Sequence, residues 1–437
     1  MSEISDSAKA WQVALALAAF MMINFIDKIV LGLVAVPMMD ELGLTPQEFG
    51  AVGSSFFWLF AIGGVGGGFL ANRFETKWLV LCMMLVWSIC QLPIACSASV
   101  GAIIVCRLAL GFGEGPAWPV AVHALYKWFP DHKRNLPIAI LAQGSGVGLI
   151  FAGFLIPAIT ERWGWRANFV VLALAGFAWA GLWAYLAEEG RLEHGPQAAS
   201  PLATAPAVSY SRLLLDRSVL GCIITHFVGY WSLALGLTWL PAYFQRGLGY
   251  DGIESGRIYS AVIVLTIPLG IALAWWSQVL LKKGVSSKTA RGRYLSCFLV
   301  FAGVLFATVH VSTGPDWIKI GILAFAIGLT PIIYSLGPAI LAEVVPPPQR
   351  GAMLAINNSI ASMAGIAAPV ASGSLIQGIP GAAGYETGFA LCGGLMIVGG
   401  LLGFWLIDPA RSLRSMDSIL FDRTLEIHPD TAEQVAP

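Results

Sequence analysis

The feature that most constrains this chain is a series of apolar stretches, each long enough to cross a membrane, that recurs from one end to the other. A helix of about 20 apolar residues crosses the roughly 30 Å hydrocarbon core of a bilayer. Only 11% of the 437 residues are charged, whereas 57% are hydrophobic, and soluble domains average about 25% charged residues. We therefore predict an all-α membrane protein. Its twelve expected spans are 11–38, 47–71, 77–96, 100–126, 135–159, 166–188, 217–245, 255–281, 292–312, 316–343, 351–377 and 383–407.

The positive charges are unevenly divided between the loops on the two sides. If both termini lie on one side, the loops on that side hold 18 Lys and Arg residues, and the opposite loops hold five: Arg162, Arg166, Arg246, Arg257 and Lys319. Cytoplasmic loops are normally enriched in Lys and Arg. The sequence thus predicts a multi-pass protein of a bacterial-type inner (plasma) membrane, with both termini cytoplasmic. The first stretch is too long, and too interrupted by charge, to be a cleaved signal peptide.

The two halves of the chain contain similar sequence segments and are separated by a polar stretch rich in Ala, Pro and Ser. Similar segments recur at offsets of 204 to 220 residues, for example Leu31–Pro37 with Leu235–Pro241 and Pro130…Arg134 with Pro346…Arg350. Duplicated six-helix units around a midplane site are a known transporter plan. We predict an N-terminal bundle at 1–188, a cytoplasmic linker at 189–216, a C-terminal bundle at 217–410 and a cytoplasmic tail at 411–437.

Four charged residues lie in the middle of the expected spans, away from their ends: Asp27, Lys28, Arg107 and Glu114. A charge near the bilayer centre costs about 2.5–3.5 kcal/mol on insertion scales, so such residues usually mark ion or substrate paths. Arg107 and Glu114 are seven positions apart, about 700° of helix rotation, and so share one face. The structural alternative is two bridges, Asp27–Arg107 and Lys28–Glu114, that only hold the first half together. We favour a functional role, because buried bridges stabilise weakly and the charges of spans seven to eleven, such as Glu343, lie near the span ends rather than in mid-span.

Several motifs resemble those of known transporters over essentially the whole chain. Arg107-(x3)-Gly111-(x3)-Gly115 and the loop from Gly68 to Lys77 resemble motifs of the major facilitator superfamily, although Asn72 and Glu75 stand where that family usually has Asp and Gly. The runs Phe25-Ile-Asp-Lys28, Arg107–Pro119 and Thr238-Trp-Leu-Pro241 resemble more narrowly the anion:cation symporters, which import sugar acids and aromatic acids and are related to vesicular glutamate and sialic acid carriers. The resemblance implies two pseudo-symmetric six-helix bundles with spans one, four, seven and ten lining the cavity.

By analogy with that family, Asp27 and Glu114 are expected to couple protons, Arg107 to tune their charge and Lys28 to bind a substrate carboxylate. The neutral substrate-binding candidates, for each of which helix packing is the alternative, are Phe25, Phe60, Gln143, Ser145, Tyr230, Trp231, Tyr334, Ser335 and Asn358. Asn358 aligns with an Asn of the sugar-acid symporters. Ser145 stands where those relatives have Gln, and Phe60 where they have Tyr. These losses of hydrogen-bonding groups favour an aromatic or lightly hydroxylated acid over a sugar acid.

We therefore expect a secondary active transporter, working as a monomer, that imports a small organic carboxylate with protons by alternating access. One alternative is an uncoupled or exchange organic-anion transporter. Another is a membrane-embedded lipid-modifying enzyme, although no His-Asp or Cys-x-x-Cys constellation lies near an interface. The zero net charge does not suit nucleic acid, and we expect neither cofactor nor metal. We expect His226 to be packed in the interior rather than to relay protons.

Overall fold

The computed structural model describes residues 2–71, 73–130, 133–190 and 208–416, and within these ranges the regular structure is helical. Twelve helical segments are long and apolar enough to cross a membrane, which confirms the predicted number. They are Ala8–Leu33, Pro46–Gly67, Thr76–Cys96, Val100–Tyr126, Asn135–Trp163, Trp165–Leu186, Arg217–Thr238, Gly252–Lys282, Lys288–Val311, Asp316–Val344, Pro347–Gly378 and Ala382–Leu406.

Several spans consist of two consecutive helices. The first half contains α1 (Ser2–Leu33), α2 (Ala35–Leu42), α3 (Pro46–Ala71), α4 (Thr76–Cys96), α5 (Val100–Glu114), α6 (Ala117–Tyr126), α7 (Asn135–Trp163) and α8 (Trp165–Leu186). The second contains α9 (Tyr210–Leu215), α10 (Arg217–Thr238), α11 (Leu240–Ala242), η3 (Tyr243–Gly247), α12 (Gly252–Lys282), η4 (Lys288–Arg293), α13 (Tyr294–Val311), α14 (Asp316–Leu329), α15 (Ile332–Val344), η5 (Pro347–Gln349), α16 (Arg350–Ser362), α17 (Ala364–Gly378) and α18 (Ala382–Leu406).

Proline accounts for matching breaks in spans four and ten. Span four is interrupted between α5 and α6 at Gly115-Pro116, and span ten between α14 and α15 at Thr330-Pro331. Proline lacks the backbone N–H that continues a helix, and its ring crowds the preceding turn. Interrupted helices at corresponding positions of two repeats point to a transporter's binding site. The break in span four follows Glu114 directly.

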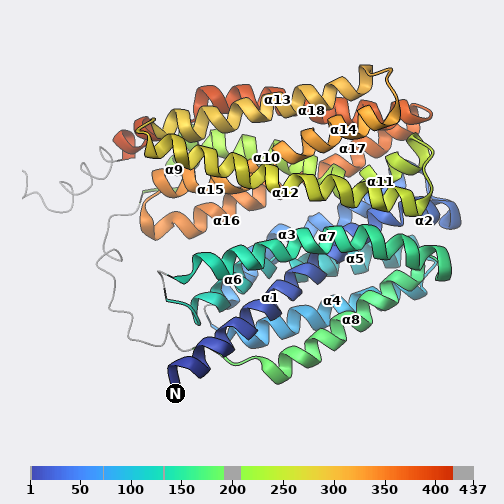
Figure 1. Ribbon diagram of the computed structural model, residues 1–437, viewed down its shortest axis with the longest axis horizontal. Coiled ribbons are helices and arrows are strands. Elements are labelled where there is room, and N and C mark those ends of the chain that lie inside the picture. The colour runs from blue at the N-terminus through green and yellow to red at the C-terminus, as the bar shows by residue number, and fades with distance from the viewer. Residues whose placement is uncertain (1, 72, 131–132, 191–207, 417–437) are drawn as a thin grey trace, which may run out of the picture.

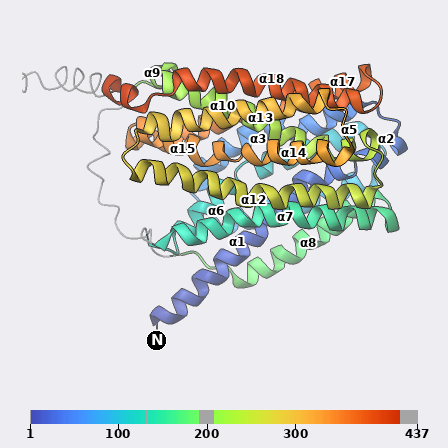
Figure 2. The same ribbon diagram turned by 45° about the horizontal axis from the view of Figure 1, so that its top comes forward.

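The helices form two bundles, one from each half of the chain (Figure 1). Helices α7 and α12 lie side by side where the bundles meet, as Figures 1 and 2 show. We call the end of the molecule that carries α2 and α11 the α2 end, and the opposite end, with the start of α1 and α6, the α6 end (Figure 1). This arrangement is the predicted pair of six-helix bundles.

Close backbone packing joins the halves towards the α2 end. A Cβ atom on Gly50 of α3 would lie 2.4 Å from the carbonyl oxygen of Pro369 in α17, and one on Gly32 of α1 would lie 2.1 Å from that of Leu237 in α10. Only glycine allows helices to approach so closely. At the α6 end, α6 packs mainly on α1, α3, α4 and α7, whereas α15 packs on α10, α12, α13 and α16. The main inter-half contacts therefore close the α2 end.

Glu189, at the start of the predicted linker, ties together three segments at the α6 end. Its carboxylate accepts hydrogen bonds from the backbone N–H groups of Thr76 and Lys77, both 3.0 Å, and from Nζ of Lys127 at 2.6 Å. It thereby caps α4 beside the loop in which Glu75 departs from the family pattern. Asn72 lies outside the described residues, as do 191–207 of the linker and 417–437 of the tail. The exact domain division remains a prediction.

Candidate functional site

Helices α1 and α5 place the four predicted charges in the interior of the first half. Asp27, Arg107 and Glu114 are only 2%, 4% and 1% exposed, and 11% of the Lys28 side chain is exposed. Helix α5 lies close against α3 because Gly111 has no side chain: a Cβ there would lie 1.7 Å from the carbonyl oxygen of Phe56. The structure thus brings all four charges into one buried cluster.

The centre of this cluster is a chain of polar contacts from Lys28 through Asn24 to Glu114. Nζ of Lys28 donates to Oδ1 of Asn24 at 2.5 Å, and Nδ2 of Asn24 donates to Oε2 of Glu114 at 2.7 Å. The ammonium also lies 3.6 Å from Oε2 of Glu114. The same ammonium lies 4.5 Å from the ring centroid of Phe25 and 5.4 Å from that of Phe60. Lys28 is therefore held between one acid and two aromatic faces.

Asp27 and Arg107 do not form the direct bridge that the structural alternative requires. Within the described residues no ion pair of 4.0 Å or less joins them, and the Arg107 guanidinium instead lies 4.9 Å from the ring centroid of Phe56. Asp27 interacts electrostatically with Glu114, Arg107 and Lys28 at longer range. Three buried atoms, Oδ1 of Asp27, Nε of Arg107 and Oε1 of Glu114, have no hydrogen-bond partner among the described residues. The cluster therefore retains unused hydrogen-bonding capacity, which is costly if packing is its only role.

Two polar residues of the cluster were not predicted from the sequence. Asn24 lies one helical turn before Lys28 and bridges the charged pair. Gln91 of α4 lies beside Asp27, and both polar atoms of its side-chain amide are buried without a well-formed hydrogen bond in the described structure. The available signal was an amide in the middle of each of two apolar spans, Asn24 in the first and Gln91 in the third.

The second half presents a largely uncharged surface to this cluster. Tyr230 of α10 is 7% exposed, its ring lies 5.9 Å from that of Phe57, and it interacts electrostatically with Glu114. Behind it, Nδ1 of His226 lies 2.6 Å from Nδ2 of Asn357, and the His226 ring lies 5.4 Å from the ring of Tyr334. His226 is buried, as expected. Tyr230 is the predicted second-half residue with the clearest link to the charges.

The remaining candidates are not joined to the cluster by hydrogen bonds among the described residues. Ser145 is half-buried on α7, whereas Gln143, Ser335 and Asn358 are exposed. Trp231 is buried, and its Nε1 has no partner in the described part of the chain. On α16 it is Asn357, not Asn358, whose side chain turns into the second half. The described residues also contain no group of three or more His, Cys, Asp or Glu placed to hold a metal.

The second half has a buried ionic group of its own, away from its midplane surface. Glu386 at the start of α18 accepts hydrogen bonds on Oε1 from Nζ of Lys319 at 2.7 Å and from the hydroxyl of Tyr243 at 3.0 Å. Its charge is thus paired and hydrogen-bonded, unlike that of Asp27. This difference points to a structural role for Glu386.

The sequence profile of the Major Facilitator Superfamily matches residues 15–331 of this chain. The chain is a member of the Major Facilitator Superfamily. A probable sulfoacetate transporter of Cupriavidus necator is 27% identical over 412 residues, which cover 90% of this chain and 93% of that protein. A D-galactonate transporter of Escherichia coli is 25% identical over 410 residues, covering 89% and 93%. These relatives confirm the resemblance to a superfamily branch of anion transporters.

A solved structure of another superfamily member confirms the fold. The inward-facing, unoccupied structure of a bacterial homologue of the human lysosomal transporter Spinster matches with a TM-score of 0.77 over 93% of this chain and 98% of that chain, at 16% identity. At this identity the likeness shows the fold alone. Family and relatives together make this chain a transporter rather than an enzyme, so the lipid-modifying alternative is wrong.

Proposed function

We propose that this protein imports a small organic anion together with protons by alternating access. The observation that carries the proposal is the buried cluster of two acids and two bases whose hydrogen-bonding capacity is only partly used. The relatives named as sulfoacetate and D-galactonate transporters both act on organic anions, which supports the substrate class.

The charge balance of the cluster links a proton to an anion. With Asp27 and Glu114 ionised, the cluster is neutral; with one of them protonated, it carries a net positive charge and attracts a carboxylate. Glu114 is the acid nearest to Lys28, so its protonation releases the ammonium from its partner. Lys28 is also the more accessible of the two, since 11% of its side chain is exposed and none of the Glu114 side chain is. We therefore assign proton coupling to Glu114 and Asp27, charge tuning to Arg107 and anion binding to Lys28.

The surroundings of Lys28 favour a substrate with few hydroxyl groups. Its ammonium faces the rings of Phe25 and Phe60, which offer apolar surface and no hydrogen-bond acceptors for a sugar chain. Sulfoacetate, the named substrate of one relative, carries a carboxylate and a sulfonate but no hydroxyl. The positive-charge bias of the loops supports a cytoplasmic location for the α6 end, which we propose. Because both halves of the site come from one chain, we propose a functional monomer.

Uptake by the purified protein in proteoliposomes tests this function. The panel is sulfoacetate, benzoate and galactonate, each with and without an inward proton gradient, for wild type, Glu114→Gln and Lys28→Ala. We expect Glu114→Gln to lose gradient-driven uptake and keep counterflow exchange, and Lys28→Ala to lose both. An unchanged gradient response in Glu114→Gln would overturn its coupling role, and uptake of galactonate alone would overturn the substrate preference. Wild-type uptake that ignores the gradient would instead support the uncoupled or exchange alternative.

A further inference from the structure

An ion pair at the α2 end joins the two halves. Arg246 of η3, in the second half, donates a hydrogen bond from its guanidinium to Oδ1 of Asp40 in α2, in the first half. Every other ion pair identified between described residues stays within one half. Parting of the halves at the α2 end, which import by alternating access requires, must therefore break the Asp40–Arg246 pair.

The neighbouring acid of α2 has a different arrangement. Glu41 pairs with Arg166 and accepts a 2.7 Å hydrogen bond from Nε1 of Trp165, both in its own half. Asp40 instead pairs with a residue of the other half. In this pair, 62% of the Asp40 side chain and 35% of the Arg246 side chain remain exposed. Ion pairs this accessible to water contribute about 0–1 kcal/mol. Another anion can therefore replace Asp40 on the guanidinium at little cost.

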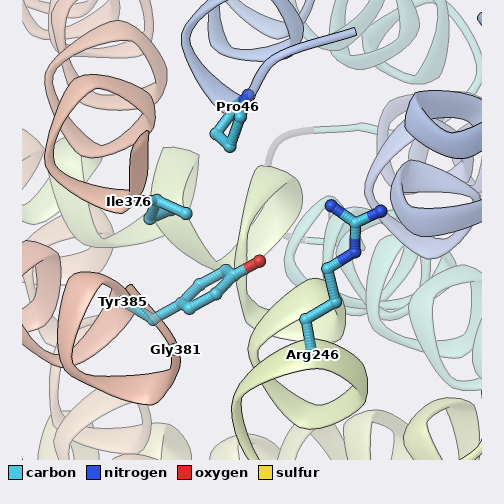
Figure 3. A pocket seen from close by; sticks show the side chains of 5 residues that line it. All are labelled: Pro46, Arg246, Ile376, Gly381 and Tyr385. Carbon is cyan, nitrogen blue, oxygen red and sulfur yellow. The ribbon is translucent and has the colours of Figure 1, made fainter. Parts of the chain in front are cut away.

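A cavity beside this ion pair is large enough to hold such an anion. It has a volume of about 310 Å³ and is lined by Pro46, Arg246, Ile376, Gly381 and Tyr385 (Figure 3). Pro46 comes from the first half and the other four from the second. The guanidinium of Arg246 and the hydroxyl of Tyr385 are directed into the same space (Figure 3).

Tyr385 is fixed in place but its hydroxyl is unused. The residue is 4% exposed, and its ring lies 6.1 Å from that of Trp239 and 5.9 Å from that of Tyr243. Its hydroxyl makes no hydrogen bond within the described part of the chain, whereas the neighbouring Tyr243 donates to Glu386. The cavity thus holds a rigidly placed neutral donor next to a cation.

We propose that this cavity is a capture site for the transported anion, at which a carboxylate replaces Asp40 on Arg246 and accepts a hydrogen bond from Tyr385. The planar guanidinium suits a carboxylate or sulfonate, since two of its N–H groups can bind two oxygens at once. Loss of the Asp40 contact removes the ion pair between the halves, which is one of the contacts that hold the α2 end closed. This inference rests on the proposed anion import and adds a second, peripheral site to the one at Lys28.

Kinetics of uptake distinguish anion capture from a purely structural ion pair. Both Asp40→Asn and Arg246→Gln abolish the pair, but only the first leaves a free guanidinium. Capture predicts that Asp40→Asn lowers the half-saturating concentration of the transported acid, while Arg246→Gln and the double variant raise it by about tenfold, as expected for one charge-assisted contact. A purely structural pair predicts that both single variants shift it in the same direction, and that result would overturn the proposal.

A binding measurement separates this inference from the proposed function. Equilibrium dialysis of radiolabelled sulfoacetate or benzoate is performed with the detergent-purified Lys28→Ala variant, in which the central anchor is absent. We expect weak residual binding that Arg246→Gln abolishes, Arg246→Lys partly restores and Tyr385→Phe weakens about threefold. Residual binding that does not depend on Arg246, or none at all, overturns the capture site. If binding to the Lys28→Ala variant depends on Arg246 but the wild-type protein shows no gradient-driven uptake, only the coupled import is overturned.

Discussion

Asn24 donates a 2.7 Å hydrogen bond to Oε2 of Glu114, a residue 90 positions further along the chain, and holds it 3.6 Å from the ammonium of Lys28. One amide thus accepts from the base and donates to the acid. It holds Lys28 and Glu114 in a defined geometry in which their charged groups are close but are not directly hydrogen-bonded to each other. The pair is therefore positioned to separate when either partner changes charge or binds another group.

Replacing Asn24 tests this bridge. Asn24→Ala leaves a buried oxygen of Glu114 without its donor, and we expect the free energy of unfolding to fall by about 1–3 kcal/mol, the usual cost of an unpaired buried polar group. Thermal unfolding in detergent micelles measures the change. Ser145→Ala is the matched control, since Ser145 makes no hydrogen bond to the cluster, and it should unfold like wild type. Equal stability of Asn24→Ala and wild type would contradict the bridge.

Neutralising Asp27 should separate stability from function. Oδ1 of Asp27 is buried without a partner, so removal of the negative charge relieves a desolvation cost. We expect Asp27→Asn to unfold at the same temperature as wild type or higher, yet to lose gradient-driven uptake. Asp251→Asn, at the exposed start of α12, controls for a neutralised aspartate and should change neither property. A clear loss of stability in Asp27→Asn would show that its charge serves packing.

Gly111 is required for the approach of α5 to α3. A Cβ there would lie 1.7 Å from a backbone oxygen, which no side-chain rearrangement relieves, whereas Gly66 has nothing within 4 Å of its Cβ position. We expect Gly111→Ala to reduce the yield of monodisperse protein in size-exclusion chromatography severely. Gly66→Ala should be tolerated or slightly stabilising, because alanine favours a helix over glycine by about 1 kcal/mol. Similar yields from the two variants would refute the packing argument.

Gly50 lies at the seam between the halves, so its replacement should shift conformation rather than prevent folding. A Cβ at Gly50 would lie 2.4 Å from the carbonyl oxygen of Pro369 in the other half. We expect Gly50→Ala to favour the state with the α2 end open. Labelling of Phe49→Cys, a position that is fully buried here, by a hydrophilic maleimide should accelerate several-fold. Gly236→Ala, with open space at its Cβ, should leave the labelling rate unchanged.

The hydrogen bonds of Glu189 at the α6 end should make the stability of the folded protein sensitive to acid. Burial alone would raise the pKa of Glu189, but hydrogen bonds from Lys127 and from the backbone of Lys77 and Thr76 lower it below its ordinary value of 4.5. A carboxylate with a lowered pKa stabilises the folded state at higher pH, and this contribution is lost as pH falls through the lowered pKa. We expect the stability difference between wild type and Glu189→Gln to shrink as the pH is lowered below 4.5. A difference that is constant with pH would refute this.

The twelve spans were predictable because membrane insertion depends on a local property, namely whether an apolar stretch is long enough to cross the bilayer. The expected first span, 11–38, was too long: α1 ends at Leu33 and α2 begins at Ala35. Ala35, Met38 and Met39 are buried within the protein. Hydropathy alone cannot tell burial against protein from burial in lipid.

By itself, the sequence determined the fold class, the duplication and the four central charges, because a charge in an apolar span carries a cost that stands out locally. The tertiary structure decided which groups meet. It made Asn24 the bridge to Glu114, turned Asn357 rather than Asn358 towards His226, and paired Asp40 with Arg246 across 206 positions. A single amide costs little free energy in a membrane span, so it does not stand out in the sequence. Contacts between distant residues depend on how the helices rotate and pack, which a local sequence pattern does not determine.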